Sequence, residues 1–352
     1  MMRVTKILFI PIAVLFAACP AAAQPFTALW IFGDSTVDTG WYRTTMSGET
    51  NYDHYMQNSS LGVGKPTSGP GPVSVEVLAT GLGLSAIPAN QTNGTNYATG
   101  GAKDFRQNLQ TGDGFPKAVP TVTQIKNYLA SHQSHASGAA LYVISSGDND
   151  VAFALKHPGN KNYLTKAANS LANAINTLRQ AGAKYILVAG LPQSFGSGQK
   201  KTFRAIYNQK LRHKLGALGV PYLWGNINRA RQLMESYKNN PPSPFGITDY
   251  TLGSTTCSGV CSACPVPTPD PNVQPAIKTD WAYVCSTSVG APSIPVNAAA
   301  SEWADDNHYA TGGQNVFGTY FYCAAQHKWP ALAWSSTPTL PFQCKRFSSI
   351  IP

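Results

Sequence analysis

The sequence has 352 residues, of which 43% are hydrophobic and only 12% are charged, and its formal net charge is +10. Average soluble domains carry about 25% charged residues, so this composition excludes a charge-rich coiled coil and an acidic disordered chain. The length supports one large domain or two ordinary ones with a buried apolar core, which excludes a small protein held together by disulfides alone.

The first residues have the pattern of a secretory signal peptide. Arg3 and Lys6 precede an apolar run over residues 7–18 that is too short to span a bilayer, and three alanines follow as a cleavage site. We expect residues 1–23 to be removed; this takes away two cations and no acid, so the net charge becomes +8. The mature chain is then expected to be secreted, either extracellular or periplasmic. The alternative is that Cys19 carries a lipid, although the residues before it fit a lipobox poorly.

Beyond this leader, apolar strand patterns alternate with amphipathic helix patterns. The strand segments are nearly continuous apolar runs, which is typical of buried parallel strands. They cover residues 28–32, 140–144, 185–189 and 220–224. The helical segments place apolar residues at spacings of three and four, and they cover residues 73–82, 119–132, 163–181, 199–218, 227–237 and 312–326. The alternation predicts an α/β fold, a three-layer α/β/α sandwich with a mainly parallel sheet and a site at the carboxyl ends of its strands.

A Cys- and Pro-rich insertion at about residues 241–295 interrupts this pattern, and we interpret residues 24–352 as a single domain that contains it. Six cysteines remain once the leader is removed, and an even number in an oxidising compartment predicts three disulfides among 15 possible pairings. These cysteines are Cys257, Cys261, Cys264, Cys285, Cys323 and Cys344. The first four also have the spacing of zinc ligands, but export and the lack of a nearby ligating His favour disulfides. We expect no metal and no organic cofactor.

The segment Gly33-Asp34-Ser35 directly follows the first predicted strand. A serine at the carboxyl end of a buried strand has its hydroxyl in the crevice where such sheets bind ligands, and the glycine eases the turn. By itself the pattern also fits a serine that caps a helix.

Three further segments supply the other groups that acyl transfer needs. Residues 96–102 contain paired glycines, and Asn149 follows the strand that ends at residue 144. Near the carboxyl terminus, Asp305 and His308 are three residues apart, which lets the carboxylate hold one imidazole nitrogen while the other faces the serine.

Together these residues predict a serine hydrolase site. Ser35 is the expected nucleophile, His308 the general base and acid, and Asp305 the group that fixes the imidazole tautomer. The expected oxyanion hole consists of the Ser35 N–H, the Gly101 N–H and the side-chain amide of Asn149.

These segments resemble the SGNH/GDSL hydrolase family, whose four blocks supply Ser, Gly, Asn and His. The blocks correspond to residues 33–35, 96–102, 147–150 and 305–308, and the resemblance covers about residues 27–325. It implies a flavodoxin-like SGNH hydrolase fold and a secreted bacterial-type esterase or lipase. Within the family, the chain is similar to autotransporter esterase passenger domains and to lipase/acyltransferases.

The sequence departs from the family pattern at three places. Gly101 is assigned by counting from the start of the second block, so Gly100 is the alternative donor. Tyr309 follows the histidine where the family commonly has Pro, which predicts a less rigid turn. Asp148 places a charge beside the expected oxyanion hole, where it would oppose catalysis unless it faces away.

The resemblance implies a carboxylic ester hydrolase that cleaves small-molecule or acyl-lipid esters through an acyl-enzyme, such as a lysophospholipase. Polysaccharide acetylesterase and lipid acyltransferase are alternatives that use the same residues, and a surface-binding module without activity is a further alternative. We hypothesise that the insertion forms a lid or latch over the acyl pocket.

A basic stretch on the helix over residues 199–218 is expected to be a solvated face, with peripheral contact to an anionic membrane or polysaccharide surface as the alternative. Its members are Lys200, Lys201, Arg204, Lys210, Arg212 and Lys214. No zinc-finger or RNA-binding motif accompanies it, so we do not expect nucleic acid as a partner.

Overall fold

The computed structural model describes residues 24–41, 65, 67, 71–106, 118–159, 162–250, 298–304 and 308–351. Several predictions fall outside these residues: the signal peptide, the lipid-bearing Cys19, most of the insertion and Asp305. The insertion cysteines Cys257, Cys261, Cys264 and Cys285 also fall outside them.

A parallel sheet lies at the centre of the described part of the chain. Its strands follow the order β1 (Leu29–Gly33), β2 (Leu141–Ser145), β3 (Tyr185–Ala189) and β4 (Leu223–Gly225). On the free side of β1, the Ile31 N–H donates to the Thr95 carbonyl at 3.1 Å and the Tyr97 N–H donates to the Ile31 carbonyl at 2.8 Å. The segment around Asn96 therefore continues the sheet as an isolated parallel bridge beside β1.

Alternate strand residues pack into two separate cores, as a sheet covered on both faces requires. In β2, Leu141 and Val143 belong to one core and Tyr142 and Ile144 to the other, and all four are fully buried. The near-continuous apolar runs in the sequence are thus explained by burial on both sides.

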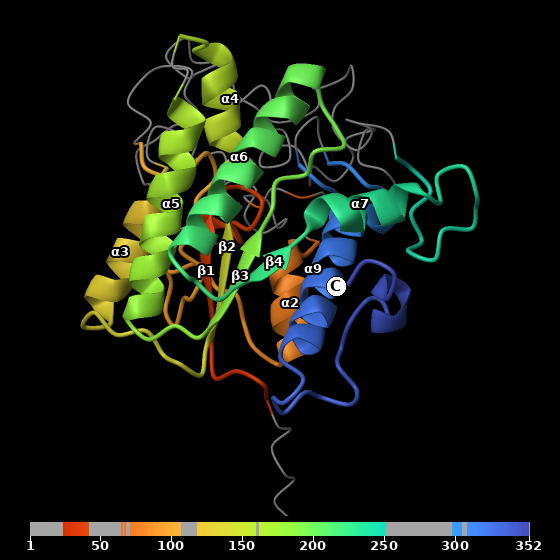
Figure 1. The fold of residues 1–352 in the computed structure, drawn as a ribbon. Coiled ribbons are helices and arrows are strands. Elements are labelled where there is room, and N and C mark those ends of the chain that lie inside the picture. Colours follow the sequence, from red (N-terminus) through yellow and green to blue (C-terminus); the bar gives the residue numbers. More distant parts are fainter. Residues whose placement is uncertain are drawn as a thin grey trace, which may run out of the picture.

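Helices cover both faces of the sheet (Figure 1). One layer contains α2 (Ser74–Leu82), α7 (Ile227–Glu235) and α9 (Thr311–Lys328). The other contains α3 (Thr121–Ser131), α5 (Tyr163–Gln180) and α6 (Gly198–Ala217), and α4 (Asp148–Lys156) packs on α5 and α6. Short 3₁₀ turns occur at Ala298–Ala300 and Cys344–Phe347. The predicted three-layer α/β/α fold is confirmed.

Two element predictions need correction. The helix α4 was not expected, because its first turn carries Asp148, Asn149 and Asp150, which the sequence analysis assigned to a loop at the end of a strand. The fourth strand begins at Leu223, three residues later than predicted, because the Val220 N–H donates to the Leu215 carbonyl (3.1 Å) and closes the end of α6.

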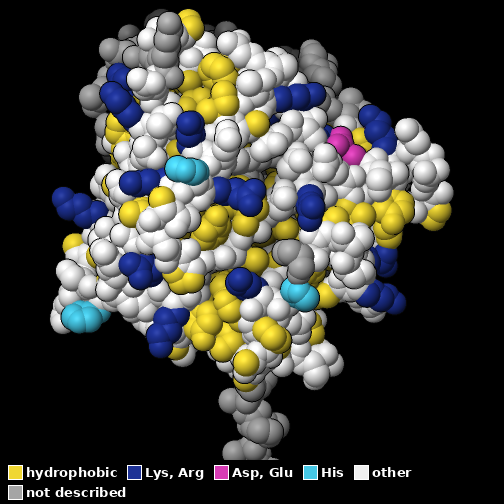
Figure 2. All heavy atoms as spheres, viewed as in Figure 1, with side chains coloured by type: hydrophobic (Ala, Val, Ile, Leu, Met, Phe, Trp, Pro, Cys, Tyr) yellow, Lys and Arg dark blue, Asp and Glu magenta, His cyan; other side chains and the backbone are white. Residues whose placement is uncertain are grey.

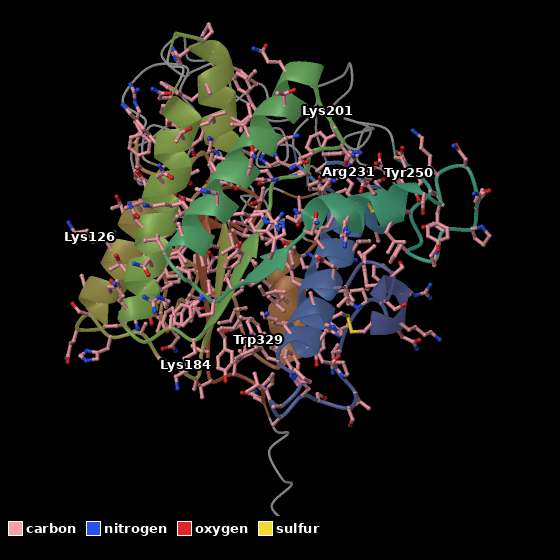
Figure 3. The ribbon with its side chains drawn as sticks, viewed as in Figure 1. Lys126, Lys184, Lys201, Arg231, Tyr250 and Trp329 are labelled. Atoms are coloured by element: carbon pink, nitrogen blue, oxygen red, sulfur yellow. A yellow bond between two sulfur atoms is a disulfide. The ribbon has the colours of Figure 1, made fainter. Side chains whose placement is uncertain are left out.

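An aromatic cluster closes the amino end of the sheet. The ring of Phe26 lies 5.3 Å from that of Tyr185, 6.0 Å from that of Trp329 and 5.7 Å from that of Trp334, each in an edge-to-face arrangement. Figure 3 shows Trp329 at this end of the molecule and Arg231 toward the opposite end. The carboxyl ends of the strands are left to form the site.

A disulfide joins Cys323 in α9 to Cys344 in the carboxyl-terminal segment, with the two Cα atoms 5.3 Å apart. It confirms the prediction of disulfide bonding for these two cysteines. Within the described ranges, no helix combines the length and the apolar character that crossing a membrane requires.

Candidate active site

Ser35 lies in a tight turn directly after β1, at the carboxyl end of the sheet. Gly33 has φ +152°, and a Cβ atom there would lie 1.9 Å from the carbonyl oxygen of Ser145 in β2. The next residue, Asp34, donates its backbone N–H to that same oxygen at 3.0 Å. Glycine is therefore required for the chain to pass so close to β2 before it turns into Ser35, which is 8% exposed.

A buried glutamine holds the beginning of this turn. Gln124 of α3 accepts a hydrogen bond from the Gly33 N–H through Oε1 and donates to the Gly33 carbonyl through Nε2, both at 2.8 Å. The sequence analysis did not identify this residue. The sequence does carry one signal for Gln124: it is a polar side chain on the apolar face of a predicted helix, beside Ile125 and Tyr128.

The second block lies beside the Ser35 turn. The Thr99 N–H donates to the Gly33 carbonyl at 3.1 Å, and Asn96 Nδ2 donates to the Val37 carbonyl at 2.7 Å. The Gly100 N–H donates to Asp38 Oδ2 at 2.8 Å. The Asp38 carboxylate therefore already accepts from Gly100, which was the alternative to Gly101 as the predicted oxyanion donor.

The third block is joined to the second by two hydrogen bonds. Asn149, in the first turn of α4, donates from Nδ2 to the Ala102 carbonyl at 3.0 Å, and the Asp104 N–H donates to Asp150 Oδ2 at 2.9 Å. A side-chain amide has two N–H donors, so this contact fixes the orientation of Asn149 and uses one of them.

Two fully buried carboxyl groups, Asp104 and Asp150, lie behind this junction. Asp104 accepts from Ser146 Oγ at 2.7 Å and from the hydroxyl of Tyr207, while Asp150 accepts from the hydroxyl of Tyr163 at 2.9 Å. Burial raises the pKa of Asp104 and that of Asp150, the latter to about 7, and the charge of Asp150 raises the pKa of Asp104 further. The sequence analysis missed Asp104, because its partners lie more than 40 residues away along the chain.

The charge of Asp148 is neutralised by a bidentate ion pair. Arg204 Nε and Nη2 donate to its two oxygens at 2.7 and 2.6 Å, and Lys200 Nζ lies 4.0 Å away. Burial opposes ionisation of Asp148, but the charges of Arg204 and Lys200 outweigh it and lower its pKa to about 2. The sequence analysis placed Arg204 on a solvated helix face, and this was wrong: its side chain is fully buried, because it lies on the same face of α6 as Tyr207.

The segment that carries His308 is held by its neighbours on both sides. The Ala304 N–H donates to the His308 carbonyl and the Ala310 N–H donates to the Glu302 carbonyl, both at 2.8 Å. The rings of Trp303 and Tyr309 stack with centroids 4.4 Å apart. Stacking and burial thus hold the Tyr309 ring, whereas residues 305–307 lie outside the described residues, so a less rigid turn stays a prediction.

A buried ion pair anchors the same segment to α7. Arg231 Nε donates to Glu302 Oε1 at 2.6 Å, and its guanidinium lies 5.1 Å from the ring centroid of Trp303. Burial raises the pKa of Glu302 to about 7, although the charge of Arg231 acts in the opposite direction.

His308 lies close to the other blocks. Burial raises the pKa of Asp34 to about 6, while hydrogen bonds from Thr36 and the charge of His308 act to lower it. The charge of His308 also lowers the pKa of Asp148. The structure thus brings Ser35, Gly101, Asn149 and His308 to one end of the sheet, whereas Asp305 lies outside the described residues.

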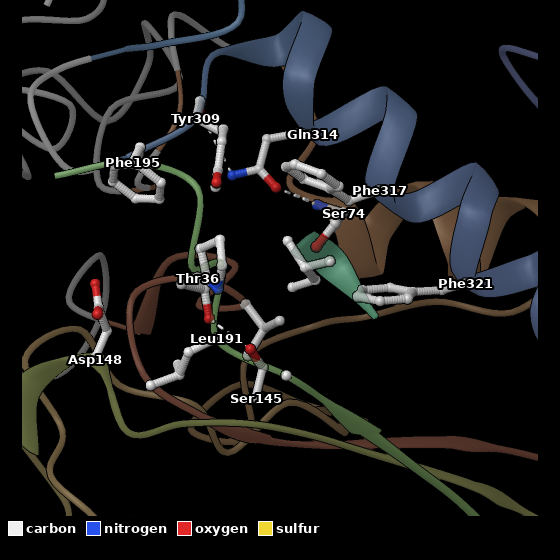
Figure 4. Close-up of a pocket in the computed structure, with 14 residues that line it drawn as sticks. Thr36, Ser74, Ser145, Asp148, Leu191, Phe195, Tyr309, Gln314, Phe317 and Phe321 are labelled. Carbon is white, nitrogen blue, oxygen red and sulfur yellow. Dashed lines mark hydrogen bonds between the residues drawn. The ribbon is translucent and has the colours of Figure 1, made fainter. Parts of the chain in front are cut away.

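A mainly apolar pocket adjoins this end of the sheet (Figure 4). Its lining includes Thr36, Asp148 and Tyr309, which are the chain neighbours of Ser35, Asn149 and His308. The remaining wall comes from the end of β2, the start of α2, the loop after β3, α7 and α9, and it includes Leu191, Phe195, Ile227, Phe317 and Phe321. The described residues contain no group of three or more His, Cys, Asp or Glu side chains placed to hold a metal ion.

The sequence over residues 29–240 matches the model of the GDSL-like lipase/acylhydrolase family. Among similar proteins, Lipase 1 of Photorhabdus luminescens is 29% identical over 175 residues, which are 48% of this chain and 23% of that protein. A GDSL esterase/lipase of Arabidopsis thaliana is 27% identical over 322 residues, with 72% of this chain and 87% of that protein covered. Acetylajmalan esterase 2 of Rauvolfia serpentina is 26% identical over 47% of this chain and 53% of its own length. The chain thus spans about a quarter of Lipase 1 and about half of the Rauvolfia esterase.

Proposed function

Because the chain belongs to the GDSL-like lipase/acylhydrolase family, we propose that it is a serine carboxylic ester hydrolase. The observation that carries this proposal is the meeting of four chain segments at one end of the sheet. They supply a serine in a turn (Ser35), the backbone amide of a glycine (Gly101), a side-chain amide held in one orientation (Asn149) and a buried histidine (His308). This set contains a nucleophile, a base and oxyanion donors, which are the groups that acyl transfer needs.

In the proposed mechanism, Ser35 Oγ attacks the ester carbonyl carbon while His308 takes the hydroxyl proton. The negative charge that develops on the carbonyl oxygen is stabilised by the N–H groups of Ser35 and Gly101 and by the remaining amide N–H of Asn149. Collapse of the tetrahedral intermediate releases the alcohol, which receives the proton from His308. Water then hydrolyses the acyl-enzyme by the reverse sequence, and Asp305 fixes the tautomer of the imidazole.

The environment of the site supports these roles. The ion pair between Asp148 of α4 and Arg204 of α6 keeps the charge of Asp148 from standing unpaired beside the oxyanion. The charges of Asp34 and Asp148 both favour a protonated His308, which is the form that the transition state produces.

The pocket beside Thr36 supports an acyl group as the part of the substrate that is buried. Its wall is formed by apolar side chains, including Leu191, Ile227 and Phe317, and it borders the residues next to Ser35 and His308 in the chain. Apolar pockets with a few polar groups at one end suit such ligands. Acyl-lipid esters are the first candidate substrate, with acetyl esters of polysaccharides and acyl transfer to another alcohol as alternatives.

We further propose that the protein is secreted, on the basis of the leader pattern over residues 1–23. A panel of p-nitrophenyl acetate, butyrate, octanoate and laurate tests the proposed substrate. The acyl-lipid assignment predicts that kcat/KM is higher for octanoate than for acetate, and the reverse order favours an acetylesterase. Ser35→Ala is expected to abolish hydrolysis of every ester in the panel, and full residual activity would contradict the assignment of the nucleophile.

A further inference from the structure

An open groove lies at the β4 edge of the sheet, between α6 and α7, and it adjoins the apolar pocket, with which it shares Gly190 and Leu191. We call it the β4 groove. It encloses about 1200 Å³ of space, part of which is open solvent. Figure 2 shows this face hollowed near its middle, with Lys, Arg and His side chains around the hollow and acidic side chains gathered in one place to the side. The residues that line the groove are Gly190, Leu191, Gln193, Ala205, Asn208, Gln209, Arg212, His213, Tyr222, Trp224, Asn226 and Asn228.

Two aromatic rings form one wall of the β4 groove. Tyr222 and Trp224 are both partly exposed, and their ring centroids lie 6.3 Å apart with the planes at 78°. Trp224 packs so closely on Gly190 that a Cβ there would lie 2.3 Å from Cζ2 of the indole. The guanidinium of Arg212 lies 5.4 Å from the centroid of Trp224. The wall is therefore rigid, apolar and bordered by a positive charge.

Three asparagines also line the β4 groove, and hydrogen bonds with the backbone already orient them. Asn226 Oδ1 accepts from the Arg229 N–H at 3.1 Å, and Asn228 Oδ1 accepts from the Gln193 N–H at 3.0 Å. Asn208 binds the backbone of the loop after β3 through both of its polar atoms. Because the oxygens of Asn226 and Asn228 already accept, these two side chains offer N–H donors to a ligand.

We propose that the β4 groove binds an acidic sugar unit of a glycan. The apolar C–H face of a sugar ring fits against Tyr222 and Trp224, the asparagine N–H groups suit its hydroxyls, and Arg212 suits a carboxylate. None of the side chains that line the groove carries a carboxylate, so nothing in it repels an acidic ligand. This proposal does not depend on ester hydrolysis, since none of these residues belongs to the proposed catalytic machinery.

The composition of the groove favours a glycan over other anionic partners. Among the described residues, Phe105 is the one large hydrophobic side chain that is clearly exposed, and it does not line the groove; Tyr222 and Trp224 are only partly exposed, which suits a ligand held within the groove better than insertion into a lipid surface.

Binding is tested with a hexamer of galacturonic acid by isothermal titration calorimetry, on the Ser35→Ala protein so that catalysis plays no part. Maltohexaose is the neutral control ligand. The test variant is Arg212→Glu, and the matched control is Lys201→Glu, which makes the same charge change on an exposed residue of α6 outside the groove (Figure 3). Both variants are checked for an unchanged thermal midpoint.

We expect the acidic hexamer to bind at least about tenfold more tightly than maltohexaose. Arg212→Glu is expected to weaken binding of the acidic hexamer by about 10- to 100-fold, because one charge-assisted hydrogen-bonded pair is lost. Lys201→Glu is expected to change the Kd by less than about twofold. Tyr222→Ala is expected to weaken binding as well, which tests the aromatic wall separately.

The proposal is wrong if the hexamer does not bind, if the neutral and acidic ligands bind alike, or if the two charge variants weaken binding equally. It is also wrong if Arg212→Glu instead reduces binding to vesicles of phosphatidylglycerol and phosphatidylcholine while leaving the hexamer unaffected, since the groove would then recognise a lipid head group. If the wild-type protein hydrolyses no ester while its Ser35→Ala variant still binds the hexamer, the proposed hydrolase is refuted and the groove assignment stays intact.

Discussion

The buried carboxyl group of Asp34 should make the stability of this protein depend on pH in a predictable direction. Asp34 is 1% exposed, and its Oδ1 accepts from the Thr36 backbone N–H at 3.0 Å and from Thr36 Oγ1 at 2.7 Å. Its Oδ2 is buried, and none of the described groups forms a hydrogen bond with it. Asp34→Asn therefore keeps both acceptor contacts and replaces the unpaired oxygen with an uncharged NH₂ group.

The magnitude follows from the raised pKa. Burial raises the pKa of Asp34 from 3.8 to about 6. A folded-state pKa above the unfolded one gives a contribution to stability that is complete below about pH 4 and is lost as the pH rises through 6. A shift of about two units corresponds to about 3 kcal/mol. Compared with the wild type, Asp34→Asn should therefore gain about 3 kcal/mol in its free energy of unfolding between pH 4 and pH 8.

Urea denaturation of both proteins at pH 4, 5, 6, 7 and 8 measures this difference. Groups that titrate identically in the two proteins cancel, so the comparison isolates the carboxyl group. A difference between the two proteins that stays constant with pH, or that changes in the opposite direction, would refute the reasoning.

Other variants probe the remaining features. Asp148→Asn should have the opposite pH dependence, because the pKa of Asp148 is lowered to about 2. The variant should lose about 2 kcal/mol of its free energy of unfolding at pH 7, and this loss should shrink as the pH falls below 4. A loss that stays constant with pH in urea denaturation would contradict the ion-pair argument. Asn149→Ala should lower kcat by about 100- to 1000-fold in an ester assay if its amide stabilises the oxyanion, and unchanged kcat would remove it from the oxyanion hole. Cys344→Ser removes a disulfide with a sequence separation of 21 and should lower the free energy of unfolding by about 3 kcal/mol, whereas no change would show that the crosslink does not constrain the unfolded chain.

The fold could be predicted well where burial follows a simple period. Strands buried on both faces give continuous apolar runs, and the spacing in α6 predicts its length to within one residue at each end. The missed helix α4 shows the limit of this method. Its first turn is acidic and it is only nine residues long, so local pattern alone did not reveal a helix that is stabilised by packing on α5 and α6.

The candidate site was predictable where its residues occur in local motifs, and not where they act through contacts between distant parts of the chain. Ser35, Gly101, Asn149 and His308 occur in recognisable local motifs at the ends of elements. The residues that position them, including Gln124 and Arg204, act across distances in the chain of 91 and 56 residues, and no local pattern encodes such pairs. Arg204 was thus expected in solvent, although its side chain is buried and paired with Asp148.

Covalent labelling with a fluorophosphonate probe tests the proposed serine hydrolase most directly. The probe reacts with an activated serine, so the wild-type protein should be labelled, Ser35→Ala should not be, and His308→Ala should be labelled far more slowly because the base is lost. Ser145→Ala, which removes a neighbouring hydroxyl that contacts Thr36, is the control and should retain labelling. Unlabelled wild-type protein, or labelling that persists in Ser35→Ala, would contradict the account.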